Sequence, residues 1–475
     1  MLSNHISKIL IENFEYTPTI SQYDLIDKLS EFIVNSKENS IFLLKGFAGT
    51  GKTTIINSLV KTFDIFKINS VLLAPTGRAA KVLSHYSQKN AYTIHKKIYR
   101  QKSMSDGLGI FVLDLNFHSN TYFIVDESSM IANQSNDLSI FGSGKLLDDL
   151  MEYVFNKKNC KLILIGDTAQ LPPVGIALSP ALNINEYQYR KFSVYECTLT
   201  DIVRQYENSG ILFNATEIRN LIENHTNDKI EINLKIFDDV IKITGEYLID
   251  EIADSYNKFG IEDTIVITRS NKQANRYNQG IRNRILFREE QISIGDYLMI
   301  VKNNYHWIQN NEDFDFIANG DIVEIVKIYD YEEKYGFNFA NVKVRFIDYK
   351  DIEIKTKILL NTLSSESAAL SNEDNKKLFY AVFEDYNDIK GKRKRINKVR
   401  EDSYFNALQV KFAYAVTCHK AQGGQWKSVF IDHGYLANKE IDIEFLRWLY
   451  TALTRAIEKL YLVNFNSSFF NESIT

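Results

Sequence analysis

Gly46-Phe47-Ala48-Gly49-Thr50-Gly51-Lys52-Thr53 is the stretch that decides the fold of this 475-residue chain. It directly follows the apolar run Ile41–Leu44 and precedes Thr54–Phe63, a stretch compatible with a helix. A GxxxxGK[ST] loop in this setting is typical of phosphate binding, because its glycines let backbone N–H groups turn toward phosphate oxygens and the helix dipole favours an anion. We therefore predict a nucleotide site in which Lys52 reaches the β- and γ-phosphates and Thr53 ligates Mg²⁺. The predicted nucleotide-contacting residues of this loop are Gly46, Ala48, Gly49, Thr50, Gly51, Lys52, Thr53 and Thr54.

Short apolar runs recur along the chain and indicate strands buried on both faces of parallel sheets. The runs are Ile41–Leu44, Val71–Ala74, Tyr122–Val125, Leu162–Ile165, Thr264–Thr268, Phe412–Val416, Val429–Ile431 and Leu460–Val463. Helical patterns lie between the first four runs. The earliest, from Leu25 to Ile33, has a predicted cap at Ser21 with Asp24 three residues later. Alternating strands and helices predict an α/β fold with two lobes.

The pattern changes between about residues 291 and 404, where apolar and charged residues alternate. Val342, Val344 and Phe346 are separated by Lys343 and Arg345, and residues 352–355 continue the same period of two. Such alternation is typical of half-exposed antiparallel strands. We therefore predict a small β-domain inserted in the second lobe.

Two adjacent carboxylates, Asp126 and Glu127, follow another apolar run. Asp126 is predicted to hold Mg²⁺ and Glu127 to polarise the attacking water. Gln170, in the loop after the fourth run, is predicted to sense the γ-phosphate or orient that water. With these side chains beside the phosphate loop, the sequence favours hydrolysis of ATP over binding alone.

The composition is that of an ordinary globular protein, with 56 Lys and Arg against 60 Asp and Glu, a net charge of −4. This balance excludes a histone-like polycation and, taken alone, argues against nucleic acid. The three cysteines are too few and too scattered for a disulfide framework, a CxxC zinc site or a four-cysteine cluster. With no secretory signal and no long apolar stretch readable, we expect a cytoplasmic protein that does not bind membranes.

Taken together, these strings resemble the superfamily 1 DNA helicases of the 5′→3′ branch, the RecD-like and Dda-like group. The matching strings run in the family's order from about residue 18 to 463. Beyond the phosphate loop and the Asp126 and Gln170 strings, they are Leu73–Lys81 (similar to motif Ia), Thr93–His95 (Ib), Leu199–Gln205 (IV), Val416–Gly424 (V) and Tyr450–Ala456 (VI).

The resemblance implies two RecA-like lobes with ATP between them. Arg204 and Arg455 would be arginine fingers of the second lobe, Gln22 would read adenine, and Lys420 would contact phosphate of ATP or of DNA. The implied single-strand contacts are Thr76, Arg78, His95, Thr417 and His419.

The resemblance also divides the chain. The first lobe would comprise residues 1–92 and 121–190, and the second lobe residues 191–290 and 405–475. Residues 93–120 would form a hairpin that splits the duplex, with its aromatic tip from Tyr99, Phe111 or Phe117. Residues 291–404 would form a barrel similar to the Src-homology-3 domain, since Gly295–Met299 and Asn319–Val323 resemble its strand and turn strings. Trp307 and the basic run Lys390–Arg400 could touch DNA, or the run could be a solvated loop.

The implied function is an ATP-dependent helicase or translocase moving 5′→3′ on single-stranded DNA, in replication, recombination or repair. Its partners would be single-stranded DNA, forked or tailed duplexes and replication or recombination proteins, and it would act as a monomer. One alternative is a motor that displaces proteins or feeds a nuclease complex. Another is a non-motor P-loop protein such as a nucleotide kinase, against which the strings of the second lobe speak.

Overall fold

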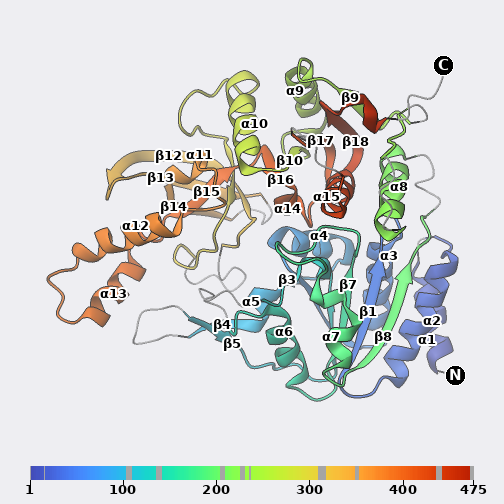
Figure 1. Cartoon of the computed structure of the whole chain (residues 1–475). Coiled ribbons are helices and arrows are strands. Elements are labelled where there is room, and N and C mark those ends of the chain that lie inside the picture. Colours follow the sequence, from blue (N-terminus) through green and yellow to red (C-terminus); the bar gives the residue numbers. More distant parts are fainter. Residues whose placement is uncertain are drawn as a thin grey trace.

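The parallel sheet around the phosphate loop forms the centre of the first lobe (Figure 1). The computed structural model describes residues 2–14, 16–102, 110–134, 142–203, 209–224, 230–234, 237–308, 317–347, 352–434 and 441–470. The strands of this sheet are, in spatial order, β3 (Ala91–Thr93), β2 (Asn69–Ala74), β6 (Thr121–Val125), β7 (Lys161–Gly166), β1 (Ser40–Gly46) and β8 (Ser193–Leu199).

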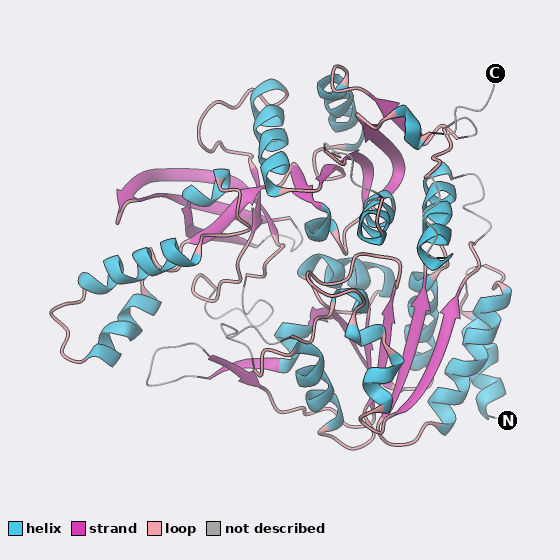
Figure 2. Cartoon of the chain, viewed as in Figure 1, coloured by secondary structure: helices cyan, strands magenta, loops and turns pink. Residues whose placement is uncertain are grey.

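Helices cover both faces of this sheet, because successive residues of each buried strand point to opposite faces (Figure 2). Phe42 and Leu44 pack with α1 (Leu2–Glu12), α2 (Ile20–Asn35) and α3 (Lys52–Ile65). Ile41 and Leu43 belong to a core on the other face, which α5 (Ile94–Ile98), α6 (Leu146–Phe155) and α7 (Ile184–Gln188) complete. Helix α4 (Gly77–Ser87) follows β2 at the edge that faces the second lobe.

The second lobe repeats this plan with a five-stranded parallel sheet. Its strands are β16 (Ala415–Thr417), β10 (Thr264–Thr268), β17 (Trp426–Asp432), β18 (Ala456–Val463) and β9 (Val240–Ile243). One face packs on α8 (Gly210–Asn224) and α15 (Ile443–Leu453), and the other on α9 (Leu248–Phe259) and α10 (Asn271–Arg284). The short helix α14 (Cys418–Ala421) follows β16.

A closed five-stranded barrel interrupts the second lobe. It consists of β11 (Tyr297–Ile300), β12 (Ile322–Lys334), β13 (Phe337–Phe346), β14 (Glu353–Leu359) and β15 (Leu408–Phe412). Between β14 and β15 the chain forms α11 (Asn361–Ser364), α12 (Asn372–Glu384) and α13 (Lys392–Glu401), and the last two project from the barrel. In the first lobe, β4 (Tyr99–Lys102) and β5 (Ile110–Leu113) form the inserted hairpin. The predicted fold class is therefore confirmed. None of the described helices is long and apolar enough to cross a bilayer.

Two predicted domain boundaries are wrong. The first lobe continues past residue 190, because β8 pairs with β1 as an edge strand; its half-buried residues form no continuous apolar run. The barrel continues past residue 404, because β15 closes it. The expected run Phe412–Val416 is accordingly split between β15 and β16, which lie in different sheets.

Three local expectations also change. The inserted hairpin spans Tyr99–Leu113 rather than residues 93–120, since β3 and α5 belong to the body of the lobe. Helix α2 is capped by Thr19, whose hydroxyl accepts from the Gln22 backbone N–H, and not by Ser21. The basic run Lys390–Arg400 lies mostly in α13 and is therefore not a loop.

Candidate nucleotide site and strand-binding surface

The phosphate loop connects β1 to the first residue of α3, as the sequence predicts. Gly49 and Gly51 have φ angles of 75° and 83°, in the left-handed region that favours glycine. A Cβ atom on Gly51 would lie 2.6 Å from Nε2 of Gln22. These glycines therefore set the path on which the backbone amides turn toward a phosphate.

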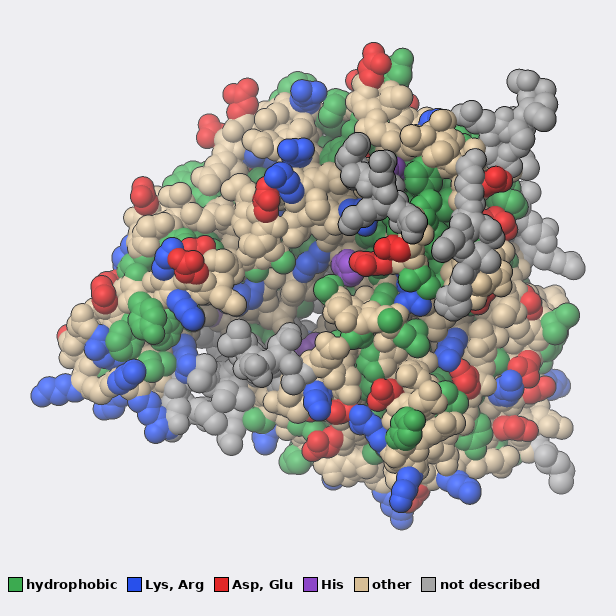
Figure 3. Space-filling model, viewed as in Figure 1, with side chains coloured by type: hydrophobic (Ala, Val, Ile, Leu, Met, Phe, Trp, Pro, Cys, Tyr) green, Lys and Arg blue, Asp and Glu red, His purple; other side chains and the backbone are tan. Residues whose placement is uncertain are grey.

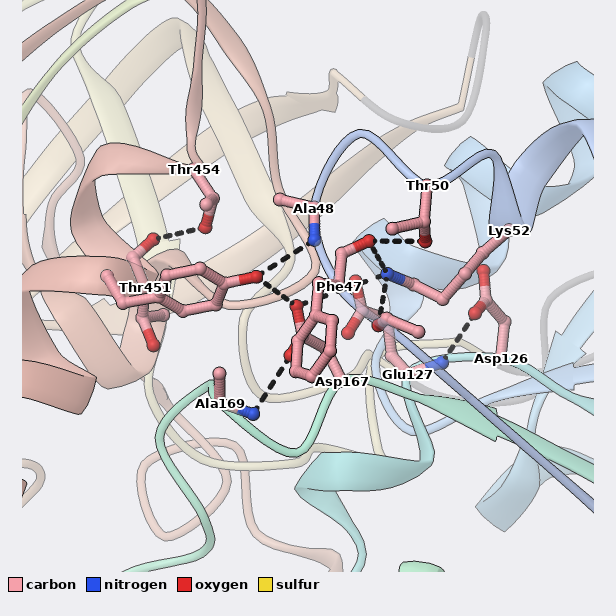
Figure 4. A network of polar contacts seen from close by, with 12 residues as sticks. Phe47, Ala48, Thr50, Lys52, Asp126, Glu127, Asp167, Ala169, Thr451 and Thr454 are labelled. Carbon is pink, nitrogen blue, oxygen red and sulfur yellow. Dashed lines mark hydrogen bonds and ion pairs between the residues drawn. The ribbon is translucent and has the colours of Figure 1, made fainter. Parts of the chain in front are cut away.

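Lys52 folds back over the loop that precedes it. Its Nζ donates to the carbonyl oxygens of Gly46 and Phe47, at 2.8 Å each, and lies 4.0 Å from Oδ2 of Asp167 (Figure 4). Thr50 Oγ1 also donates to the Phe47 carbonyl, at 2.8 Å. A phosphate in the loop would compete with these neutral carbonyls for the ammonium hydrogens, and a charged acceptor binds them more strongly.

Asp126 and Glu127 lie at the carboxyl end of β6, beside the phosphate loop (Figure 4). Glu127 has a φ of 52°, an uncommon conformation for a residue other than glycine, and its N–H donates to Oδ1 of Asp126 at 2.8 Å. Burial and the charge of Glu127 raise the pKa of Asp126 to about 7, and Lys52 opposes this rise. A cation beside the two carboxylates would relieve their repulsion.

Gln170 and Gln22 occupy different environments. Gln170 is buried, and within the described part of the chain its Oε1 has no hydrogen-bond partner, which leaves it available to a ligand or water. Gln22 uses both of its amide atoms: Oε1 accepts from Thr19 N–H at 2.9 Å and Nε2 donates to the Thr50 carbonyl at 3.0 Å. Gln22 thus ties α2 to the phosphate loop, and its contact with adenine stays a prediction.

Tyr450, in α15 of the second lobe, reaches the nucleotide site of the first lobe. Its fully buried hydroxyl accepts from Ala48 N–H at 2.8 Å and donates to Oδ2 of Asp167 at 2.7 Å. The next residue, Thr451, accepts from Leu171 N–H through its hydroxyl at 2.8 Å. Sequence reasoning assigns no role to Tyr450 or Asp167. The available signal was that Tyr450 begins the motif VI-like string and that Asp167 lies three residues before Gln170.

Arg455 is buried within the second lobe. Its guanidinium donates to the Thr451 and Gly424 carbonyls at 3.0 and 3.2 Å and to Oγ1 of Thr454 at 3.1 Å. These bonds engage three of its five N–H hydrogens, and its role as a finger stays a prediction. Arg204, the other predicted finger, lies outside the described residues.

The motif Ia-like and motif V-like strings meet across the two lobes. The guanidinium carbon of Arg78 lies 4.0 Å from the ring centre of Trp426. A Cβ atom on Gly423 would lie 3.0 Å from Cβ of Ala79 and 3.3 Å from Oγ1 of Thr76, which caps α4. The structure therefore brings Thr76 and Arg78 to the loop that follows Thr417 and α14.

Two of the remaining predicted contacts are neutral histidines, and a third is a lysine that stays mainly protonated at neutral pH. Burial lowers the pKa of His95 to about 4 and also lowers that of His419, so both imidazoles are mainly uncharged at neutral pH. Burial lowers the pKa of Lys420 to about 8, and its Nζ donates to Oδ1 of Asn319 in the barrel at 2.5 Å. That contact with the barrel favours DNA over the nucleotide as its phosphate partner, and both roles stay predictions.

The hairpin stem is fixed at its base. The hydroxyl of Tyr99 donates to the buried Asp149 at 2.6 Å, and the ring of Phe111 lies 4.2 Å from that of Tyr305, in the loop after β11. Because both aromatic residues are buried in the stem, neither supplies the expected tip. Phe117 is 80% exposed but follows β5, and residues 103–109 lie outside the described part of the chain.

A buried ionic network joins the barrel to the second lobe. Asp296 accepts from Nε and Nη2 of Arg282, at 3.1 and 3.0 Å, and from Nη1 of Arg288 at 2.8 Å. The Tyr414 hydroxyl, in the segment between β15 and β16, donates to the same carboxylate at 2.9 Å. Both connections between barrel and lobe therefore converge on one residue.

Two sequence families match this chain, the AAA domain over residues 28–231 and the UvrD-like helicase C-terminal domain over residues 412–463. An uncharacterized protein of Acanthamoeba polyphaga mimivirus is 28% identical over 91% of this chain and 97% of its own length. The ATP-dependent DNA helicase dda of Enterobacteria phage T4 is 28% identical over 54% of this chain and 55% of its own length. The RecBCD enzyme subunit RecD of Buchnera aphidicola subsp. Schizaphis graminum is 25% identical over 89% of this chain and 70% of its own length. A solved structure of Pif1 helicases at forked duplex DNA can be superposed on this chain. The match spans 96% of this chain and 95% of the Pif1 chain, with a TM-score of 0.48 and 16% sequence identity.

Proposed function

We propose that this chain is a superfamily 1 helicase of the RecD and Dda type: an ATP-hydrolysing motor that moves 5′→3′ along single-stranded DNA and separates duplex DNA. The observation that carries this proposal is the pair of bonds from Tyr450 to Ala48 and Asp167. A nucleotide kinase or a switch has no second RecA-like lobe to make such a contact. The alternative of a motor without helicase activity is not favoured by the relatives dda and RecD.

The residues of the site fit magnesium. Mg²⁺ prefers hard oxygen ligands and is usually held by one or two side chains together with substrate phosphates and water. Thr53 and Asp126 offer a hydroxyl and a carboxylate, and the crowding of Asp126 against Glu127 favours a cation there. When bound, Mg²⁺ would neutralise charge that develops on the phosphates.

The residues of the chain would act in sequence on ATP. The loop amides and Lys52 bind the phosphates, which draws the ammonium away from the Gly46 and Phe47 carbonyls. Glu127 orients the attacking water and takes up its proton. Arg455 leaves its bonds within the second lobe and stabilises the transition state, a contribution of about 10³–10⁵ in rate for such fingers.

Strand movement would follow from the same closure. Thr76 and Arg78 hold the strand in the first lobe, and Thr417 and His419 in the second. Hydroxyls, backbone amides and neutral imidazoles contact phosphates and bases without reading sequence, as a motor requires. The anchored hairpin would separate the duplex ahead of this track. All parts of the cycle lie on one chain, so we propose a monomer that acts in replication, recombination or repair with proteins of those processes.

The decisive experiment measures unwinding of duplexes that carry a 5′ or a 3′ single-stranded tail. We expect ATP-dependent unwinding of the 5′-tailed substrate alone, and preference for the 3′ tail would contradict the proposed direction. ATP turnover with and without single-stranded DNA provides the second measurement. A kinase or a switch would show no stimulation, and the same assay with single-stranded RNA tests the preference for DNA.

A further inference from the structure

The two helices α12 and α13 form an arm on the barrel that the proposed ATP cycle does not use (Figure 1). Arg395 fixes α13 on α12, because its guanidinium carbon lies 4.0 Å from the ring centre of Phe383 and its Nη2 donates to the Phe383 carbonyl at 3.2 Å. Val399 is fully buried beside α12 in the same core. The arm is therefore a packed element with a defined outer face.

That outer face carries a concentrated positive charge. Residues 390–400 include seven Lys or Arg and no Asp or Glu. The rest of the chain has 49 basic residues (56 minus 7) against 60 acidic ones, a net charge of −11. Figure 3 shows cationic side chains gathered along this projecting edge.

Three lysines of the arm are unneutralised. Lys390, Lys392 and Lys394 are exposed, and within the described part of the chain none of them pairs with a carboxylate. Lys394 also lies one helical turn from Lys398, a like-charge spacing that destabilises a helix. Lys398 itself pairs with Glu401 at 3.0 Å, whereas an anionic partner outside the chain would offset the charge of the other three lysines.

We propose that the α12–α13 arm binds the phosphate backbone of duplex DNA ahead of the point of strand separation. This inference rests on the proposed helicase function. Helix α13, which carries these lysines, has no aromatic residue on which unpaired bases could stack; the exposed Tyr380 of the arm lies on α12. Lysines bind phosphates irrespective of sequence. The strand-binding residues lie where the two lobes meet, and the arm projects from the far side of the barrel (Figure 1). DNA that reaches the arm is therefore outside the single-strand track.

The test replaces Lys390, Lys392 and Lys394 together with alanine in the full chain, a change that favours helix formation. The matched control replaces Lys61, Lys157 and Lys158, three exposed lysines of the first lobe, and so alters the net charge equally. Fluorescence anisotropy measures the affinity for a 5′-tailed duplex and for its single-stranded tail between 50 and 200 mM salt. Each lost phosphate contact lowers the salt slope on duplex DNA by about 0.9.

For the arm variant we expect the slope on the tailed duplex to fall by about 2 to 3 and the slope on the single strand to stay unchanged. The control variant should match the wild type on both. An equal loss on the single strand would overturn the proposal and assign the arm to that strand. Unchanged slopes on both, in a protein whose ATPase still responds to single-stranded DNA, would overturn it in favour of an acidic protein partner. A wild-type protein without that response would instead refute the helicase function.

Discussion

Removing one hydroxyl tests whether the second lobe senses the nucleotide site. In Tyr450→Phe the buried ring stays, so no cavity forms, but Ala48 N–H and Oδ2 of Asp167 lose their partner. A buried polar group left unsatisfied costs about 1–3 kcal/mol. Loss of the partner of both groups therefore weakens the contact between the lobes by at least about 2 kcal/mol. If this loss appears in the rate of ATP hydrolysis, it corresponds to a decrease of about 30-fold.

The assay compares ATP turnover with and without single-stranded DNA, alongside the affinity for a fluorescent ATP analogue. We expect DNA-stimulated turnover of Tyr450→Phe to fall about 30-fold, while nucleotide affinity changes less than about threefold because the phosphate loop is intact. Tyr187→Phe is the control, since Tyr187 is equally buried but its hydroxyl donates to the Ala181 carbonyl within the first lobe. Wild-type stimulation in Tyr450→Phe, or an equal loss of affinity and rate, would refute the reasoning.

Lys52→Ala should abolish ATP turnover, and turnover at the wild-type level would refute the phosphate-loop assignment. Arg455→Ala should reduce hydrolysis by about 10³-fold or more while nucleotide affinity, measured by titration, stays within a few-fold; a larger loss of affinity than of rate would exclude a finger. Asp296→Asn should leave Arg282 buried without its carboxylate and destabilise the protein by about 3–5 kcal/mol, seen as a lower melting temperature with nucleotide binding retained. An unchanged melting temperature would show that the network does not hold the barrel to the lobe.

The sequence predicts those parts of the fold whose signal is local. The strand run Thr264–Thr268 is observed within its predicted bounds, because strands buried on both faces require unbroken apolar residues. The edge strand β8 could not be predicted from apolar runs, since it needs apolar residues only where it contacts the sheet. The split of Phe412–Val416 could not be predicted either, because only tertiary pairing shows that one apolar run serves two sheets.

The candidate site divides in the same way. Lys52 and Asp126 are predictable because a phosphate loop and a strand-end carboxylate carry their chemistry in adjacent residues. The contacts of Tyr450 depend on how the two lobes pack, because Tyr450 and its partner Ala48 are 402 residues apart in sequence. A sequence pattern can place Tyr450 in a string, but only the structure shows which backbone N–H its hydroxyl meets.

A continuous series of contacts in the second lobe links the candidate nucleotide site to the candidate strand-binding surface. Tyr450 holds Ala48 of the phosphate loop, and one turn later in the same segment Arg455 holds the Gly424 carbonyl. The neighbouring glycine packs against Thr76 in the first lobe. If Arg455 turned its guanidinium to a γ-phosphate, its bond to the Gly424 carbonyl would be lost or rearranged, and the loop that carries the predicted strand contacts would change one of its supports. Packed elements of this kind switch between discrete arrangements rather than deform gradually. We therefore expect a movement of Arg455 during ATP hydrolysis to change how this loop is held.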